Sequence, residues 1–268
     1  MGAAVGQCLV AGGHEVLWIP QGRSPATRAR AGAAGLIGAA DLTDLVHRAD
    51  VIVSVVPPHG ALEIARQVAG FGGLYLDANA IAPATAREVA GIVEGGGAGY
   101  VDGGIIGSPP VEPGFIRLYL SGARAREIRA LFDGTAVTTR IVERDEVGAA
   151  SAVKMAYASW TKGSAALLLA ARTLARAQGV EDVLLAEWGL SQAGLEERSV
   201  RAASSAAGKG WRWVAEMEEI AATMGAAGLP EGFHQAAAEI YRRAPHDAEA
   251  GLDTVLDALS ADKGVPER

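Results

Sequence analysis

The feature that most constrains the fold is a nearly continuous apolar run from Val51 to Val56, with the sequence VIVSVV. Strands that are buried on both faces have this pattern, and they belong to parallel sheets covered by helices on each side. The run stops at Pro57, because a central strand cannot continue through proline. We therefore expect a central sheet strand at 51–56, with helices packed above and below it.

The rest of the first half alternates helix and strand patterns, whereas the chain from residue 147 onward contains only helical ones. This alternation predicts an α/β fold, a Rossmann-like doubly wound parallel sheet, followed by an all-α C-terminal domain. We place the boundary between residues 1–146 and 147–268. The expected helices are 2–11, 27–34, 42–47, 61–69 and 83–93, and the expected strands are 15–19, 51–56, 74–76, 100–101, 118–121 and 138–142.

The amino-acid composition argues against several classes of protein. Lys and Arg total 24 against 31 Asp and Glu, a net charge of −7, which disfavours nucleic acid as a partner. A single cysteine, Cys8, excludes an intramolecular disulfide, and the five histidines show no metal-ligand spacing, so we expect no metal site. No apolar stretch is long enough to span a bilayer, and no signal peptide is recognisable. We expect a cytoplasmic protein with neither a membrane nor a nucleic-acid partner.

The N-terminal sequence is unusual for a nucleotide-binding α/β fold. Such folds begin with a strand and a glycine-rich turn, which leads the pyrophosphate to the N-terminus of the next helix. Here Gly2 opens a helical segment that ends at Gly12-Gly13, followed by the strand pattern at 15–19. We expect that the first strand and the first two glycines are missing, and that Gly2 takes the third glycine's place. The alternative is an ordinary helix that contains glycine.

Four further segments occur in an order that resembles the β-hydroxyacid dehydrogenase family, which includes 6-phosphogluconate and 3-hydroxyisobutyrate dehydrogenases. The C-terminal half is similar to a branch with a 6-phosphogluconate-dehydrogenase-like domain. The resemblance implies an NAD(P)-binding domain at 1–146, a helical substrate and dimerisation domain at 147–268, and a homodimer. The four segments are Val53–Pro58 (VSVVPP), Asp77–Pro83 (DANAIAP), Asp102–Ser108 (DGGIIGS) and Gly148–Lys154 (GAASAVK).

The same resemblance assigns roles to individual residues. Lys154 corresponds to the lysine that gives or takes the hydroxyl proton, a general acid or base. The alternative for this only charged residue between Val147 and Thr161 is a lysine that extends to solvent. The implied cofactor contacts are Gly2, Val56, Pro57 and Asn79, and the implied substrate contacts are Ile106, Gly107, Ser108 and Tyr157.

Two departures and two alternatives accompany these assignments. Ala158 stands where the family carries an asparagine, and Ile106 stands where it carries a serine, which puts an ordinary hydroxy-acid substrate in doubt. Asn79 has the alternative role of capping the helix that begins at Pro83. Asp102 has the alternative role of ending a strand.

The residues after the strand at 15–19 bear on the choice of dinucleotide. An acidic residue there would hold the ribose 2′-hydroxyl of NAD, whereas a basic one accommodates the 2′-phosphate of NADP. The sequence offers Arg23 and Ser24 and no carboxylate, so we expect NADP to be favoured over NAD. The alternative is that Arg23 is a solvated loop residue.

Together these features predict an NADP-dependent oxidoreductase that interconverts a small hydroxy acid, or a related alcohol, and its carbonyl. Two alternatives stay open. One is an N-terminally truncated or degenerate Rossmann protein without catalytic activity. The other is an imine reductase-like enzyme, although that branch does not use a lysine at the position of Lys154.

The helical half contributes one cluster of conspicuous residues. Trp211 and Trp213 are two positions apart, so they cannot share a helix face, and at least one must contact another element. We expect Arg212 to pair with Glu216 at the i+4 position. We expect His234 to be a helix-start or core histidine.

Overall fold

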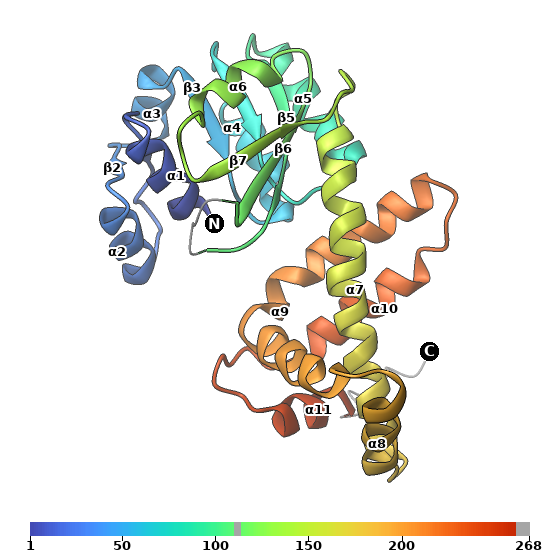
Figure 1. Ribbon diagram of the computed structural model, residues 1–268. Coiled ribbons are helices and arrows are strands. Elements are labelled where there is room, and N and C mark those ends of the chain that lie inside the picture. The colour runs from blue at the N-terminus through green and yellow to red at the C-terminus, as the bar shows by residue number, and fades with distance from the viewer. Residues whose placement is uncertain (110–113, 261–268) are drawn as a thin grey trace, which may run out of the picture. The chain divides into compact units, whose positions relative to one another are not determined.

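The computed structural model describes residues 1–109 and 114–260. The chain divides into two compact units, Met1–Met155 and Ala156–Arg268 (Figure 1). The division falls inside one long helix, α7 (Ala149–Ala177), which begins two residues after the boundary expected from the sequence. The first unit is α/β and the second is helical, so the expected fold class is confirmed.

The N-terminal unit contains two sheets. Strands β1 and β2 form a short parallel pair, and the other five strands lie in the order β3-β4-β5-β6-β7. All pairs in the larger sheet are parallel except β5 with β6, an exception that the sequence patterns did not indicate. The strands are β1 (Leu17–Trp18), β2 (Ile37–Gly38), β3 (Val51–Ser54), β4 (Leu74–Asp77), β5 (Gly99–Ile106), β6 (Ile116–Ser121) and β7 (Val137–Ile141).

Helices cover both faces of the larger sheet. Residues of α1 and α6 pack with Leu76 and Val101 on one face, and residues of α4 and α5 pack with Tyr75 and Tyr100 on the other. The expected doubly wound arrangement is therefore present, and β1 and β3 lie in separate sheets. The helices of this unit are α1 (Gly2–Ala11), α2 (Pro25–Ala33), α3 (Leu42–Arg48), a 3-10 turn η1 (Pro58–Gly60), α4 (Ala61–Gln67), α5 (Pro83–Gly95) and α6 (Ala125–Leu131).

Local sequence explains where these helices begin. The Ser24 hydroxyl accepts a hydrogen bond from the Thr27 amide at the start of α2, and Pro25 occupies the first position, where its missing N–H costs nothing. Asp41 caps α3 in the same way through the Asp44 amide. Pro83 opens α5 as expected, but the N-cap residue there is Ala82, which makes no side-chain cap.

The C-terminal unit is built from helices packed around α9. Helices α10 and α9 make its most extensive contact, and α8 and α11 also pack on α9. No helix of the described ranges is long and apolar enough to cross a membrane. Besides the second half of α7, the unit contains α8 (Glu181–Ser191), α9 (Leu195–Ala226), α10 (Gly232–Arg243) and α11 (Leu252–Ser260).

Candidate active site

A row of four polar residues crosses the larger sheet. Strand register places Ser54 beside Asp77, Asp77 beside Asp102, and Asp102 beside Ser121. Neighbours in register point to the same face of a sheet, and each of the four is at most 4% exposed. Buried polar groups are costly unless they are hydrogen-bonded, so the partners of this row indicate what it holds in place.

Asn79 ties the end of β4 to the end of β3. Its Oδ1 accepts from the Val56 amide at 2.6 Å, and its Nδ2 donates to the Ser54 hydroxyl at 3.0 Å. Asn79 is 2% exposed and makes no cap to α5, so the capping alternative is wrong. The structure therefore brings together Asn79 and Val56, two of the expected cofactor contacts, and places Pro57 next along the chain.

Asp77 is the most perturbed carboxyl group of the row. Its Oδ1 accepts from the Asn79 amide at 3.0 Å, while its Oδ2 lies buried without a hydrogen-bond partner among the described residues. Burial raises the pKa of Asp77 to about 7, and the neighbouring charge of Asp102 adds to the shift. Asp77 therefore sits close to a change of protonation at neutral pH.

Asp102 holds the beginning of α7. Its carboxylate accepts hydrogen bonds from the Ser121 hydroxyl at 2.9 Å, the Ser151 amide at 3.0 Å and the Ser151 hydroxyl at 2.6 Å. The Ser121 hydroxyl in turn accepts from the Ala150 amide at 3.0 Å. Asp102 is the fourth of eight residues in β5, so the alternative that it ends a strand is wrong. We call Asp102, Ser121 and Ser151 the sheet anchor.

Lys154 lies one helical turn beyond the sheet anchor and is half-buried. It sits over Gly104 of β5, where an added Cβ would lie 3.1 Å from the Lys154 Cβ and 2.7 Å from the Ala150 carbonyl oxygen. The absence of a side chain at Gly104 thus allows α7 to approach the sheet. The structure places the candidate catalytic lysine close to the backbone of the DGGIIGS segment.

The expected substrate contacts at the end of β5 differ in their exposure to solvent. Ile106 is buried, and Ser108 is exposed. Gly107 has φ +118, and a Cβ on it would lie 2.0 Å from the Phe115 carbonyl oxygen, so only glycine fits this turn. Gly107 therefore has a structural reason to be glycine, independent of any substrate.

Gly2 marks the start of α1 beside the end of β3, since an added Cβ would lie 3.9 Å from the Val55 Cβ. Ligands of doubly wound sheets bind at the carboxyl ends of the strands, and helix N-termini favour anions. The first turn of α1 contains no acidic residue. Gly2, Val56 and Asn79 thus gather at one edge of the unit.

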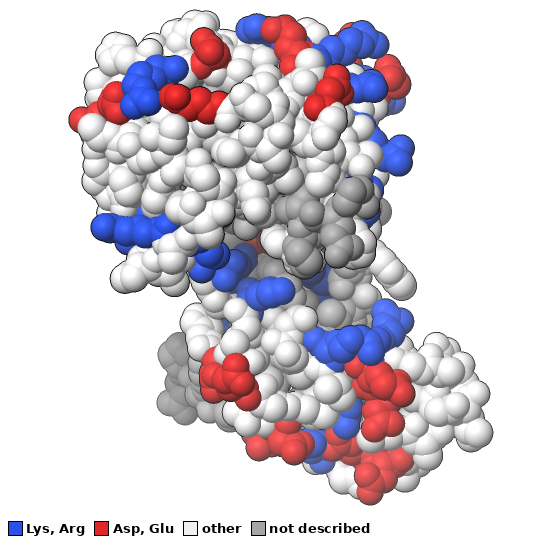
Figure 2. All heavy atoms as spheres, turned by 60° about the vertical axis from the view of Figure 1, so that its left-hand side comes forward, with Lys and Arg blue, Asp and Glu red and all other residues white. Residues whose placement is uncertain are grey.

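Arg23 and Ser24 follow β1, and both are exposed. Ser24 caps α2, and the Arg28 guanidinium donates to the Arg23 carbonyl oxygen at 3.1 Å. Residues 16–40 contain three arginines and no carboxylate. On the face drawn in Figure 2, basic and acidic side chains mix at the upper end of the N-terminal unit, while those at its lower end are mainly basic.

The expected contacts on the second half of α7 belong to the C-terminal unit. Tyr157 is 46% exposed, and its carbonyl oxygen accepts from the Thr161 hydroxyl at 3.1 Å. Ala158, which stands at the family's asparagine position, is 1% exposed. An apolar residue suits that buried position.

A second set of contacts holds α7 in the C-terminal unit. Lys162 forms an ion pair with Glu216 of α9, and its ammonium group lies 5.2 Å from the centre of the Trp213 ring. The Tyr241 hydroxyl donates to the Lys162 carbonyl oxygen at 2.7 Å. The Ser159 hydroxyl contacts the His234 Nε2 at 2.9 Å. We call Ser159, Lys162, Glu216, His234 and Tyr241 the bundle anchor.

This arrangement corrects one expectation and confirms two. Glu216 pairs with Lys162 rather than with Arg212, whose guanidinium instead lies 4.9 Å from the Trp211 ring centre. Trp213 packs edge-on against Tyr241 of another helix, as the two-residue spacing required. His234 is a buried core histidine of α10.

Sequence reasoning missed the two serines of the sheet anchor and Ser54. Ser121 ends a strand, and Ser151 follows Gly148 by three residues, but neither position is distinctive without the register of the sheet. Among the described residues, no group of three or more His, Cys, Asp or Glu side chains could hold a metal ion. The candidate site is therefore one of amide, hydroxyl, carboxylate and ammonium groups.

The C-terminal half of the chain is similar to a known protein domain. Residues 175–244 match a family model described as a domain of unknown function (DUF1932). A curated relative, an uncharacterized 28.5 kDa protein in the 7S RNA 5′ region of Methanothermus fervidus, is 31% identical over 172 residues. That match spans 64% of this chain and 66% of the relative, slightly less than two thirds of its length.

Solved structures match over nearly the whole chain. The conserved protein MTH1747, described as structurally similar to 3-hydroxyacid dehydrogenases, is 26% identical with a TM-score of 0.62, covering 96% of this chain and 91% of that one. A 3-hydroxyisobutyrate dehydrogenase of Mycobacterium tuberculosis, described with L-serine, is 21% identical with a TM-score of 0.68, covering 97% and 96%.

A reductive aminase of Aspergillus terreus, in complex with NADPH, cyclohexanone and allyl amine, is 20% identical with a TM-score of 0.56, covering 96% and 95%. At 21% and 20% identity, the dehydrogenase and the aminase show likeness of fold. The chain therefore shares the fold of 3-hydroxyacid dehydrogenase-like proteins over nearly its whole length.

Proposed function

We propose that this protein is an NADP-dependent oxidoreductase that interconverts a small hydroxy acid, or a related alcohol, and its carbonyl compound. The observation that carries the proposal is the position of Lys154, over Gly104 and one turn from the sheet anchor. A lysine that merely extends to solvent has no need of a glycine beneath it or of a buried carboxylate at the start of its helix.

The residues present fit an anionic dinucleotide. The first turn of α1 has no acidic side chain, and the stretch 16–40 contributes only positive charge. The Arg23 guanidinium, with its forked donors, suits a ribose 2′-phosphate, which favours NADP over NAD. The hydrogen bond from the Val56 amide to Asn79 makes this edge of the sheet rigid, and this rigid edge would contact the nicotinamide end of the dinucleotide.

A bound nicotinamide dinucleotide would supply or accept the hydride. The chain's own part is the proton. In the reductive direction, the Lys154 ammonium group would donate a proton to the carbonyl oxygen of the substrate, and in the oxidative direction the amine would remove the hydroxyl proton. The preference for NADP favours reduction as the working direction.

The first test is a titration of the protein with NADPH and with NADH, followed by quenching of tryptophan fluorescence. We expect NADPH to bind more tightly, and Arg23→Ala to weaken NADPH binding about tenfold with little effect on NADH. Equal binding of both dinucleotides would overturn the role of Arg23. No binding by the folded protein would favour the non-catalytic Rossmann alternative.

The second test is turnover with NADP and small 3-hydroxy acids, L-serine and 3-hydroxyisobutyrate among them. Lys154→Met should reduce turnover by about 10²–10⁴-fold while leaving NADPH affinity nearly unchanged. The matched control is Lys209→Met, since Lys209 is exposed on α9. Full activity of Lys154→Met would overturn its assigned role, and reduction of a ketone–amine mixture alone would favour the imine reductase alternative.

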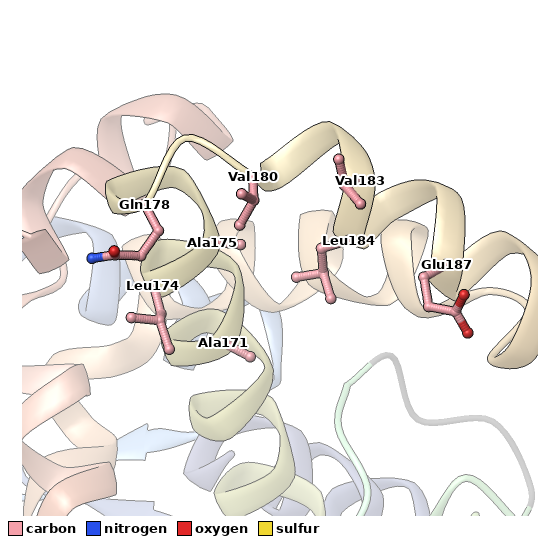
Figure 3. Close-up of a pocket in the computed structure, with 8 residues that line it drawn as sticks. All are labelled: Ala171, Leu174, Ala175, Gln178, Val180, Val183, Leu184 and Glu187. Carbon is pink, nitrogen blue, oxygen red and sulfur yellow. The ribbon is translucent and has the colours of Figure 1, made fainter.

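We further propose that the protein is a homodimer, paired through α7 and α8 of the C-terminal unit. Tyr157, Trp160, Leu167 and Leu174 recur along α7 at heptad-compatible spacing, and they are 46%, 71%, 54% and 62% exposed. A largely apolar hollow of about 580 Å³ continues this stripe onto α8 (Figure 3). Its lining residues are Ala171, Leu174, Ala175, Gln178, Val180, Val183, Leu184 and Glu187.

An exposed apolar stripe of this length is typical of an interaction surface. Val183→Glu, at a residue that is 70% exposed, should convert the dimer into a monomer in light scattering coupled to size-exclusion chromatography. The matched control is Leu229→Glu, because Leu229 is 53% exposed and lies outside the stripe and the hollow. A wild-type protein that is monomeric at micromolar concentration would contradict this proposal.

A further inference from the structure

The start of α7 is closed on the sheet rather than open to solvent. An α-helix leaves its first amides without partners within the helix. Here the Ala149 amide donates to the Glu146 carbonyl oxygen and the Ala152 amide to the Gly148 carbonyl oxygen. The two amides between them, of Ala150 and Ser151, are bound by side chains of β6 and β5.

The group at the centre of this arrangement is the Asp102 carboxylate. It accepts three hydrogen bonds from Ser121 and Ser151 and is 1% exposed. The positive end of a helix favours an acidic side chain at this position. Strand pairing fixes Asp102 in the sheet. The hydrogen bonds of Asp102 to Ser151 therefore fix the start of α7 relative to the sheet.

This position is transmitted to Lys154 over a single turn. Ser151 and Lys154 are three residues apart and are therefore neighbours on one side of α7. Gly104, two residues after Asp102 on the same strand, leaves room for α7, because a Cβ added there would meet the Ala150 carbonyl oxygen and the Lys154 Cβ. One strand thus fixes both the axial height of the helix, through Asp102, and its distance from the sheet, through Gly104.

We propose that Asp102 is a positioning residue for Lys154, acting through Ser151 and Ser121 to hold the first turn of α7. The inference rests on the proposed role of Lys154 and deepens it, because it names the groups that set the orientation of the lysine. Asp102 itself need not touch a substrate or a cofactor. Its effect is to restrict where the Lys154 ammonium group can go.

The substitution that isolates this role is Asp102→Asn. Asparagine has nearly the same shape, but one acceptor oxygen becomes an NH₂ group that donates hydrogen bonds. With its oxygen in the place of Oδ2 it can still accept from the Ser121 hydroxyl and the Ser151 amide, but it carries no negative charge and must donate to the Ser151 hydroxyl instead of accepting from it. Ser151→Ala is the milder second variant, and Ser151→Thr, which keeps the hydroxyl, is its conservative counterpart.

The experiment combines two readouts that need no substrate. Hydrogen exchange followed by mass spectrometry reports the opening of amides 150–154. Reductive methylation of Lys154 with formaldehyde, measured across pH by mass spectrometry, reports the environment of its amine. We expect Asp102→Asn to accelerate exchange of these amides by about tenfold or more and to shift the pH profile of Lys154 methylation.

Ser151→Ala should show the same changes to a smaller extent, and Ser151→Thr should resemble the wild type. The matched control is Tyr241→Phe, which removes a hydrogen bond to α7 in the other unit. It should leave both readouts at residues 150–154 unchanged. A Lys154 methylation profile that is the same in Asp102→Asn, Ser151→Ala and the wild type would overturn the proposal, even if exchange rises.

The outcome is separable from that of the proposed function, which depends on NADPH titration and turnover of the wild-type protein. If the wild type bound no NADPH, the oxidoreductase proposal would fail, whereas the exchange and methylation data would still decide whether Asp102 positions Lys154. If Asp102→Asn did not fold, the Ser151→Ala and Ser151→Thr pair would decide it instead.

Discussion

Helix α7 is held in different ways in the two units through which it passes. The sheet anchor binds backbone amides of α7, whereas the bundle anchor mainly binds its side chains. A bond to a backbone amide fixes the rotation and height of a helix, because the amide cannot move independently of it. A bond to a lysine side chain leaves the helix freer, since a flexible stem lies between the charge and the backbone.

The two kinds of anchor indicate which segment of α7 must be positioned most accurately. The segment that carries Lys154 is held by short, rigid groups on a sheet, and sites supported by rigid elements are positioned more accurately. The segment in the C-terminal unit is held by an ion pair that is largely removed from water, so removing only one of its partners is costly. We therefore expect substitutions in the two anchors to differ both in size and in kind.

The largest expected effect on stability is in the bundle anchor. The side chains of Lys162 and Glu216 are 19% and 7% exposed, so Lys162→Met would leave a carboxylate almost without solvent. We expect a loss of about 3–5 kcal/mol in the free energy of unfolding, measured with denaturant. The double variant Lys162→Met with Glu216→Leu should regain most of this loss, because it removes the buried charge as well.

Little effect of Lys162→Met on stability would show that the ion pair is weak and would remove the contrast between the anchors. NADPH titration is the complementary readout. Both the single and the double variant should bind NADPH like the wild type when folded, because neither alters a residue of the N-terminal unit.

The next largest expected effect is a pH dependence of the free energy of unfolding, caused by Asp77 in the polar row of the sheet. The pKa of Asp77 is raised to about 7 in the folded chain, above its unfolded value. Between pH 4 and 7 the folded state therefore binds more protons than the unfolded state, and this contribution to stability falls as pH rises, by up to about 1.4 kcal/mol per pH unit.

Asp77→Asn carries no such charge, so it should be more stable than the wild type at pH 8, and the advantage should vanish near pH 4. Urea denaturation of both proteins at several pH values measures the difference directly. A difference that stays constant with pH would show that Asp77 ionises normally despite its burial.

Much of the fold could be predicted from the sequence because the relevant signals are local. Apolar runs and proline or glycine boundaries identified six of the seven strands that the described ranges contain, although β5 is longer than expected. Strand β2 was missed because its two residues are exposed and carry no apolar pattern. The antiparallel direction of β6 was missed because periodicity indicates that a strand is present and does not indicate its direction.

The site was predictable only where a residue type was conspicuous in its own segment. Lys154 and Asn79 stood out in that way. Ser121 and Ser151 did not, since their role depends on a register that joins residues 19 and 49 positions away from Asp102. The expected pair of Arg212 and Glu216 failed for the same reason, because Glu216 finds its partner 54 residues away rather than one helical turn away.

A smaller effect should distinguish close approach from hydrogen bonding in the sheet anchor. Gly104→Ala would place a methyl group 2.7 Å from the Ala150 carbonyl oxygen, so α7 must move away from the sheet. We expect a loss of about 1–3 kcal/mol in unfolding free energy and a clear fall in turnover. The matched control, Gly91→Ala in α5, meets nothing within 4 Å and should stabilise the protein by up to about 1 kcal/mol.

The smallest expected effect concerns the one backbone contact of the bundle anchor. Tyr241→Phe removes the hydroxyl that donates to the Lys162 carbonyl oxygen, which should cost about 1 kcal/mol in unfolding free energy. Turnover per folded molecule should stay at the wild-type level, because the acceptor of the lost bond lies about two helical turns beyond Lys154 and belongs to the other unit. A fall in turnover would mean that α7 transmits displacements along its whole length, and the two anchors would then have to be treated as one.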